Sequence, residues 1–358
     1  MTFDVSLKAW LALSLTRGLG GESARRLLKE FGSPDAVFAA SISSLKSVVK
    51  ADIAAEISKG VTDDVIAPAL AWLEDGNNHI VTLADSDYPQ ALLNIPDPPL
   101  LLYVKGRLNL LNQSALAIVG SRSATPQGIN NAEAFAKSLS DAGLCIISGM
   151  AHGIDAAAHR GALRGQDSSI AVVGTGLDKV YPAANRDLAH ALAQQGALIS
   201  EFPLGTPPLA ANFPRRNRLI SGMSLGCLVV EASLQSGSLI TARLALEQGR
   251  DVFAIPGSIH APQSKGCHAL LKQGAKLVET AQDILEELGG LLVSPAQGAN
   301  SEGPDSALLE HLGFDSVNVD TLSVRCGLTI AELSAMLLTL ELNGRICVLP
   351  GGLYQRIH

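Results

Sequence analysis

Few aromatic residues, few cysteines and no long apolar segment mark this sequence. Aromatic residues make up 4% of its 358 residues, so few rings are free to stack on a ligand. The five cysteines are scattered and odd in number, which suits neither a zinc site nor a set of disulfides. We expect buried, reduced thiols in a cytoplasmic protein. No apolar run approaches the roughly 20 residues of a membrane span, so no membrane association is expected.

An excess of positive charge is also missing. The formal net charge is −7 at pH 7, from 27 basic and 34 acidic residues. Long-range attraction of a nucleic acid needs a positive surface, so any polyanion site here must be a local patch. Hydrophobic residues make up 47% of the chain, which is enough for sizeable cores. The length predicts two or three domains.

The central segment, residues 117–257, repeats one pattern: a short apolar run, a loop of small residues and an amphipathic helix. Runs such as AIVGSR, CIISGMAHG and IAVVGTG lack polar alternation and stop at Gly, Ser or Thr. Strands buried on both faces of a parallel sheet have this pattern. We predict an α/β fold with a Rossmann-like, doubly wound, mostly parallel sheet of six to nine strands. Ligands of such sheets bind at the carboxyl ends of the strands.

The segments on either side predict two further domains. Residues 1–74 predict an all-helical domain in which RGLGG joins two helices, as in helix-hairpin-helix or SAM-like units. The glycines of such a hairpin let backbone amides approach a DNA phosphate, and the alternative is a plain helical bundle. Residues 75–288 form the α/β domain, with strands near residues 79–106 at one edge of the sheet. Residues 289–304 have the composition of a linker.

Residues 305–358 predict a winged helix, with three helices followed by a hairpin at PGG. Its expected recognition helix, residues 329–343, contains Glu332 and Glu341 and no basic residue. Base readout normally needs Arg, Lys, Asn or Gln at that place. We therefore interpret this domain as a module that contacts protein rather than as a DNA reader.

Five loops at the predicted carboxyl edge are basic or rich in free amides. The GSR loop follows a strand and precedes a helix, so its amides and the helix N-terminus suit an anion. The dinucleotide fingerprint G-x-G-x-x-G is absent. Each loop alone could be a solvated surface, but together they predict a polyanion groove. Its candidate residues are Gly120, Ser121, Arg122, Lys179, Arg215, Arg216, Arg218, Ser236, Gly237, Ser238 and Lys265.

Metal and catalytic chemistry are weakly supported by the residues. Among His152, Asp155 and His159, only the last two have the i, i+4 spacing of ligands on one helix, and no cysteine cluster accompanies them. We expect no metal and no cofactor, and a capping role for Asp155. An enzyme acting on nucleotides is the alternative, as in phosphoribohydrolases with a PGGxGTxxE loop. The comparable loop here, EASLQSGSLITA, has no glutamate after its glycine until Glu247. A nucleotide sensor using the same pocket is a third possibility.

Seven ordered motifs between residues 85 and 280 resemble the DNA-processing protein A family, also called DprA or Smf. They are GSR, SGMAHGIDAAAHRGAL, AVVGTGLDKVYPAAN, ISEFPLGTPP, NFPRRNRLISG, VEASLQSGSLITARLALEQGRDVFAIPGS and SKGCHALLKQGA. The flanking domains are similar to extensions that some members carry. One departure is His268, where members often have Asn.

The resemblance implies a non-catalytic protein of the cytoplasm that binds single-stranded DNA. It further implies loading of the RecA recombinase onto incoming DNA in natural transformation, and a homodimer formed through the Rossmann-like domain. On the family pattern, Arg122 and Lys179 match the DNA-binding pocket. The arginines of NFPRRNR and Lys265 are its neighbours.

Overall fold

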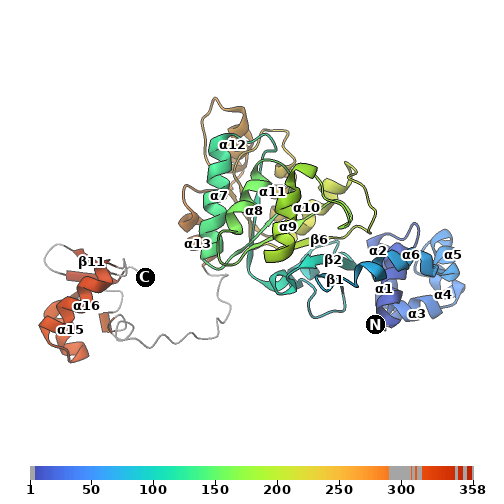
Figure 1. The fold of residues 1–358 in the computed structure, drawn as a ribbon, viewed down its shortest axis with the longest axis horizontal. Helices are drawn as coiled ribbons and strands as arrows, with labels where there is room; N and C mark the ends of the chain where they lie inside the picture. Colours follow the sequence, from blue (N-terminus) through green and yellow to red (C-terminus); the bar gives the residue numbers. More distant parts are fainter. Residues whose placement is uncertain are drawn as a thin grey trace. The chain divides into compact units, whose positions relative to one another are not determined.

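The computed structural model describes residues 5–289, 308, 311–312, 317–342, 346–349 and 353–356. The chain forms two compact units, Met1–Leu292 and Val293–His358 (Figure 1). The predicted linker lies almost wholly outside the described residues, as do most of the first winged-helix helix and the PGG turn.

The N-terminal segment is helical, as predicted, and short capped helices build it. Ser33 and Ser41 are N-caps whose hydroxyl groups accept hydrogen bonds from the amides of Ala36 and Ser44. Such caps satisfy amide groups that a helix start leaves unpaired. Leu13, from the first helix, is fully buried in the apolar core of this segment. The helices are α1 (Val5–Leu15), α2 (Gly21–Phe31), α3 (Pro34–Ala39), α4 (Ile42–Lys46), α5 (Ala51–Lys59) and α6 (Asp63–Trp72).

A nine-stranded sheet forms the centre of the first unit, with the order β1-β2-β6-β5-β4-β3-β7-β8-β9. Strand β2 is antiparallel to β1 and β6, and all other pairings are parallel. The predicted edge strands therefore extend the sheet on one side. The strands are β1 (Asn78–Thr82), β2 (Leu101–Gly106), β3 (Ala115–Val119), β4 (Cys145–Ser148), β5 (Ser169–Val172), β6 (Ala197–Ser200), β7 (Gly226–Val229), β8 (Asp251–Ala254) and β9 (Lys276–Leu277).

Helices cover both faces of this sheet, which confirms the doubly wound fold (Figure 1). Along β3, Ala117 and Val119 belong to one apolar core, and Leu116 and Ile118 belong to the other. Side chains of a strand alternate between faces, so an unbroken apolar run is what burial on both sides requires. One face packs against α10 (Asn212–Gly222), α11 (Ser238–Glu247) and α12 (Lys265–Lys272). The other packs against α7 (Pro126–Asp141), α8 (Ile154–Ala162), α9 (Arg186–Gln195) and α13 (Ala281–Leu288).

The strand order reverses between β3 and β7. From β3 the chain adds β4, β5 and β6 on one side, and then returns to add β7, β8 and β9 on the other. The connections leaving β3 and β7 therefore diverge to opposite faces, which leaves a crevice between them at the carboxyl edge. This switch point is where open α/β sheets bind their ligands.

The second unit has the predicted winged-helix elements. Its sheet has the order β10-β12-β11 and pairs antiparallel throughout. Leu322, Leu333 and Leu337 are buried in one apolar core, and Glu341 is exposed on the recognition helix. The side chain of Glu332 lies outside the described part. The elements are β10 (Val317–Asn318), α15 (Val319–Cys326), α16 (Ile330–Leu342), β11 (Ile346–Leu349) and β12 (Leu353–Arg356).

The cysteines of the described part are free thiols, as expected. Cys145, Cys227 and Cys267 are buried, and Cys326 is half-buried. Burial disfavours the thiolate and raises the pKa of Cys145 and Cys227 to about 12. None of the helices in the described ranges is both long and apolar enough to cross a membrane.

Buried His159 predicts a loss of stability in acid. Its Nδ1 lies 2.7 Å from the Ser169 hydroxyl, and burial lowers its pKa from 6.5 to about 3. Between these values the unfolded chain binds a proton that the folded chain does not. The free energy of unfolding should therefore fall by about 1.4 kcal/mol per pH unit as the pH drops below 6.5.

The His159→Gln variant should lose this contribution to the slope in chemical denaturation between pH 6.5 and 4. Exposed His190 provides the control, because His190→Gln should keep the wild-type slope. Equal slopes for His159→Gln and the wild type would contradict the assignment.

Candidate anion-binding site

A polar pocket of about 680 Å³ opens at the switch point. One wall is the loop after β3, residues 119–123, and another is the loop after β7, which leads into α11. The third wall is the first half of α10 with Tyr181. We call it the anion pocket. It brings together seven of the eleven predicted residues: Gly120, Ser121, Arg122, Arg216, Ser236, Gly237 and Ser238.

The GSR loop is held by Glu231, which follows β7. Its backbone oxygen accepts a hydrogen bond from the Ser121 amide at 2.7 Å. Its carboxylate accepts two hydrogen bonds from Thr125, one from the amide at 2.9 Å and one from the hydroxyl at 2.5 Å. Thr125 in turn caps α7 by accepting from the Gly128 amide. The expectation that the N-terminus of α7 takes part in the anion site is wrong, because this carboxylate already occupies it.

Arg122 is the exposed cation of the pocket. Its guanidinium lies over the Phe213 ring, 5.7 Å from the ring centre, and Phe213 lies 5.6 Å from Tyr181. A guanidinium above an aromatic face is attracted by the ring and keeps its donors at the edge free for an anion. In the sequence, Tyr181 and Phe213 stand next to two of the basic loops. Their contact with Arg122 is seen only in the folded structure.

Arg216 lies beneath the pocket and is 4% exposed. Its Nη1 donates to the carbonyl oxygen of Gly149 at 2.8 Å and also to that of Val172, at the ends of β4 and β5. Burial lowers its pKa to about 10, so it stays charged at neutral pH. Arg216 therefore links two strands and places a buried positive charge under the pocket.

Among the described residues that line the pocket, Asp155 is the one that carries a carboxylate. Its Oδ2 accepts from the Ala151 amide at 3.2 Å, in the loop after β4, and no side chain caps the start of α8. Asp155 therefore makes a hydrogen bond at the sheet edge and does not have the predicted capping role. Burial raises its pKa, and Arg216 opposes that rise. A side chain at Gly149 would collide with both charged groups, since a Cβ there would lie 2.7 Å from each. Arg122, Arg216 and Asp155 leave the pocket with one excess positive charge.

The loop after β7 supplies hydroxyl groups. Gly237 is the N-cap of α11 and has no side chain to cap the helix, and the amide of Ser238 donates to the Ser236 hydroxyl at 3.4 Å. The hydroxyl groups of Ser236 and Ser238 lie 2.7 Å apart at the mouth of the helix. Two hydroxyl groups at the positive end of a helix dipole are suited to a phosphate oxygen. Asn217 and Gln263 also line the pocket, and no pattern in the sequence indicates them.

Four predicted residues lie outside the pocket. Lys179 and Lys265 are exposed, and each donates to a backbone oxygen, Lys179 to Gly205 and Lys265 to Ile259. Arg215 and Arg218 line a second cavity of about 200 Å³ on the opposite side of α10. Both pair with the buried carboxylate of Glu201, at 3.2 Å and 2.5 Å.

The residues considered for a metal site do not converge. His152 is exposed, His159 is buried against Ser169, and Asp155 lies beside Arg216. Over the ranges that the structure describes, no three His, Cys, Asp or Glu side chains form a group able to hold a metal ion. His268, the departure from the family pattern, places Nε2 3.0 Å from the carbonyl oxygen of Gly257.

Comparison with known families gives two matches. The model of the family described as DNA recombination-mediator protein A matches residues 79–289, and that of the DprA winged helix domain matches residues 293–352. Protein Smf of Escherichia coli is 47% identical over 303 residues, covering 82% of this chain and 81% of Smf. The DNA processing protein DprA of Streptococcus pneumoniae is 48% identical over 206 residues, covering 58% of this chain and 73% of that protein.

Solved structures agree with these matches. The crystal structure of DprA from Streptococcus pneumoniae has a TM-score of 0.69 at 37% identity, covering 80% of this chain and 99% of that one. A structure of DprA from Helicobacter pylori has a TM-score of 0.54 at 31% identity, covering 59% and 96%. That structure is described as showing a single-stranded DNA binding mode.

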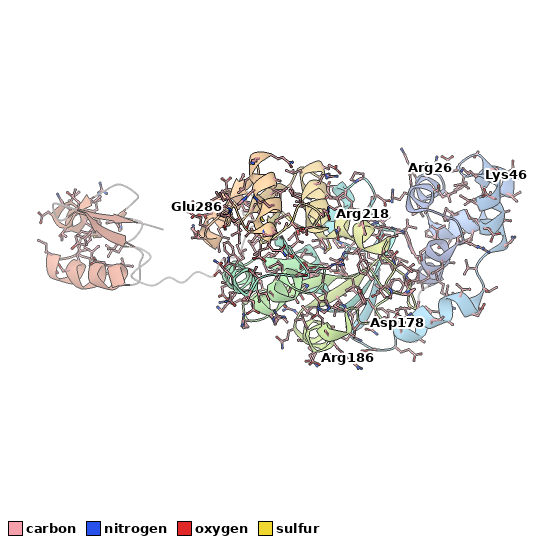
Figure 2. The ribbon with its side chains drawn as sticks, turned by 90° about the horizontal axis from the view of Figure 1, so that it is seen from above. Arg26, Lys46, Asp178, Arg186, Arg218 and Glu286 are labelled. Carbon is pink, nitrogen blue, oxygen red and sulfur yellow. The ribbon has the colours of Figure 1, made fainter. Side chains whose placement is uncertain are left out.

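The two pocket arginines should differ in their effect on stability. Arg216→Ala removes the buried positive charge beside Asp155 and leaves the carbonyl groups of Gly149 and Val172 without this donor. We expect it to lower the free energy of unfolding by about 3–5 kcal/mol. Arg122→Ala and the exposed control Arg186→Ala should each change it by about 0.5 kcal/mol or less (Figure 2). Urea denaturation measures all three, and a small effect of Arg216→Ala would contradict its structural role.

Proposed function

The chain belongs to the DNA recombination-mediator protein A family, and on this premise we propose that it binds single-stranded DNA at the anion pocket. The observation that carries the proposal is the pocket's place and content. At the switch point, exposed Arg122 and the serine hydroxyl groups at the N-terminus of α11 line one pocket, together with the buried charge of Arg216. The related structure described by its single-stranded DNA binding mode supports the same ligand.

A single strand fits this site better than a duplex does. The pocket contains cations and serine hydroxyl groups together with two aromatic rings, Tyr181 and Phe213. Unpaired bases have free faces that such rings can stack on, whereas a duplex keeps its bases stacked internally. We propose that Lys179 and Lys265, exposed on other loops of the same edge, contact further phosphates along the strand.

The proposal extends to the role of this binding. We propose that the protein protects incoming DNA and loads the RecA recombinase in natural transformation, acting in the cytoplasm. We further propose a homodimer through the Rossmann-like domain, 75–288, and a C-terminal domain, 305–358, that contacts protein. The family resemblance supports these steps, and the exposed acidic Glu341 supports the last.

The geometry does not favour hydrolysis of a nucleotide. A hydrolase of the phosphoribohydrolase type would need a carboxylate free to act on the substrate as an acid or base. Asp155 accepts from Ala151 and lies beside Arg216, and Glu231 is turned to Thr125. We therefore propose that the protein has no enzymatic activity. Release of free base from a nucleotide by the purified protein would contradict this.

Charge removal in the pocket should weaken DNA binding in a salt-dependent way. For Arg122→Ala with Lys179→Ala we expect at least a tenfold loss of affinity for a dT oligonucleotide. The slope of log affinity against log salt should become shallower by about 0.7 for each phosphate that the variant no longer neutralises. Fluorescence anisotropy at several salt concentrations measures both quantities.

Arg186→Ala is the matched control, since it removes one exposed positive charge on α9, outside the pocket. It should leave affinity and slope close to the wild-type values. Unchanged affinity of the double variant at moderate salt would show that the strand lies elsewhere.

The C-terminal domain should be dispensable for DNA binding. It forms its own compact unit, so a chain ending at residue 292 keeps the pocket intact. We expect its affinity for single-stranded DNA to stay within about twofold of the full chain, because the recognition helix offers no cation to a phosphate. A large drop in affinity would identify this domain as a DNA reader.

A further inference from the structure

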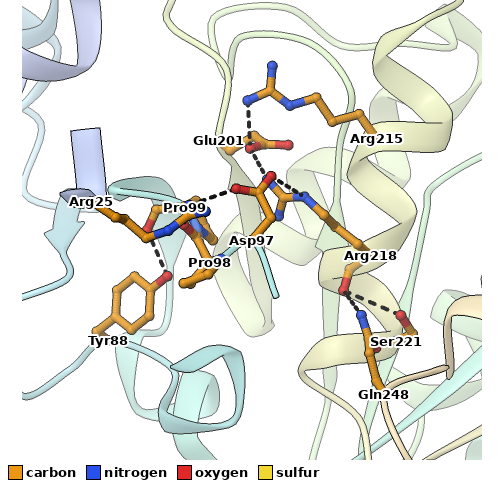
Figure 3. Close-up of polar contacts among 10 residues, drawn as sticks. All are labelled: Arg25, Tyr88, Asp97, Pro98, Pro99, Glu201, Arg215, Arg218, Ser221 and Gln248. Atoms are coloured by element: carbon orange, nitrogen blue, oxygen red, sulfur yellow. Dashed lines mark hydrogen bonds and ion pairs between the residues drawn. The ribbon is translucent and has the colours of Figure 1, made fainter. Parts of the chain in front are cut away.

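A chain of ion pairs links the helical domain to α10, away from the anion pocket (Figure 3). Arg25 on α2 donates from Nη1 to Asp97 Oδ1 at 2.6 Å and to the carbonyl oxygen of Pro98 at 2.8 Å. The second carboxylate oxygen of Asp97 lies 3.4 Å from Nε of Arg218 on α10. Asp97 therefore pairs with one arginine from each side.

The chain of ion pairs ends in the sheet. Arg218 lies 2.5 Å from Oε2 of Glu201, the residue that follows β6, and Glu201 is 3% exposed. Burial raises the pKa of Glu201, and the nearby Arg218 and Arg215 oppose this rise. An exposed ion pair contributes little, but a pair this deeply buried leaves an uncompensated charge when one partner moves. The position of Arg218 is thus tightly restrained.

The hairpin of the helical domain faces the same carboxylate. Gly20 is the N-cap of α2 and offers no side chain to the free amides of the helix start. A Cβ at Gly21 would lie 3.2 Å from Oδ1 of Asp97 and 3.1 Å from Arg25. A carboxylate is favoured at a helix N-terminus. The place at which a helix-hairpin-helix unit would approach a DNA phosphate is taken here by a carboxylate of the same chain.

Helix α10 presents different residues to the two cavities. Arg215 and Arg218, three positions apart, line the second cavity, whereas Phe213, Arg216 and Asn217 line the anion pocket. Residues three positions apart in a helix share a face, and the residues between them turn away. A shift of Arg218 therefore moves the wall of the anion pocket.

Helix α11 is tied to the same point. The carbonyl oxygen of Arg218 accepts from Nε2 of Gln248, at the C-terminal end of α11. The other end of α11, at Ser238, lines the anion pocket. Two of the three pocket walls thus depend on where Arg218 is held.

We propose that Asp97 is a positioning residue for the DNA site, through which the docked helical domain fixes α10. This inference rests on the proposed function. The helical domain then acts on DNA binding indirectly, by bracing the pocket, and not by contacting the strand.

Replacing Asp97 distinguishes a positioning role from a purely electrostatic effect, because the two predict opposite changes in DNA affinity. Removing a negative charge near bound DNA should raise affinity if Asp97 acts only through its field. If Asp97 positions α10, Asp97→Asn should lower the affinity for a dT oligonucleotide by about fivefold or more. The salt slope should stay at the wild-type value, since the same phosphates are still neutralised, and Asp97→Glu should restore most of the affinity.

Arg25 gives the matched pair on the helical side. Arg25→Ala should weaken binding to a similar extent with the same salt slope, and combining it with Asp97→Asn should add little. The exposed neighbour Arg26, on the same helix, is the control, and Arg26→Ala should bind as the wild type does (Figure 2). A shallower salt slope for Arg25→Ala would show that Arg25 contacts a phosphate directly and would overturn the proposal.

Tryptophan emission reports docking independently of DNA. Both tryptophans, Trp10 and Trp72, lie in the helical domain, and Trp72 packs edge-on against Tyr103 of β2 with ring centres 5.9 Å apart. Asp97→Asn should change this emission in the DNA-free protein. If the wild type binds DNA and Asp97→Asn binds equally or more tightly, the positioning role fails while the proposed function stands. If the wild type binds no single-stranded DNA, the proposed function itself fails.

Discussion

The reversal of strand order between β3 and β7 is the constraint on which the rest of this structure depends. Because the chain leaves these two neighbours towards opposite faces, their loops separate and open the anion pocket. Strand pairing does not close a pocket at such a point, so other interactions must hold it. Here Glu231 ties the loop after β3 to β7, and Arg216 links the ends of β4 and β5. Glu231 is half-buried and Arg216 is buried. A charge removed from water is tolerated only when its partners are in place, so both groups help to fix the geometry of the site.

The distribution of charge gives this acidic chain a local positive site, which the proposed function requires. With a net charge of −7, the protein as a whole does not attract DNA. Two of the candidate arginines, Arg215 and Arg218, share the Glu201 carboxylate, and Arg218 also pairs with Asp97, so together they add less positive field than two free cations would. Arg122 remains exposed above the pocket, and Arg216 adds a charge beneath it. In the proposed function, binding depends on a few donors in the anion pocket. The positions of these donors therefore have to be maintained by the surrounding structure.

Local sequence patterns predicted the sheet, its two helical layers and the loops at its carboxyl edge. They did so because strands buried on both faces are continuous apolar runs, which can be recognised in the sequence. They did not predict which of the candidate cations line the pocket. Helical spacing alone separates Arg216 from Arg215 and Arg218, but their partners are set by packing. Glu231 lies 106 positions from Thr125, and Asp97 lies 72 positions from Arg25, so neither pairing leaves a signal in the neighbouring residues. The Glu231 carboxylate at the start of α7 was not anticipated from the sequence, because the two segments are far apart in the chain.

The central claim is that the carboxyl edge of the sheet binds a run of phosphates on a single strand. The most direct test is the affinity of the full chain for dT oligonucleotides of increasing length, with a mononucleotide and a duplex for comparison, at two salt concentrations. The account predicts that affinity rises with length until the groove is filled, falls with salt, and is weaker for the duplex. Tight binding of the mononucleotide with no gain from length, or a preference for the duplex, would contradict it.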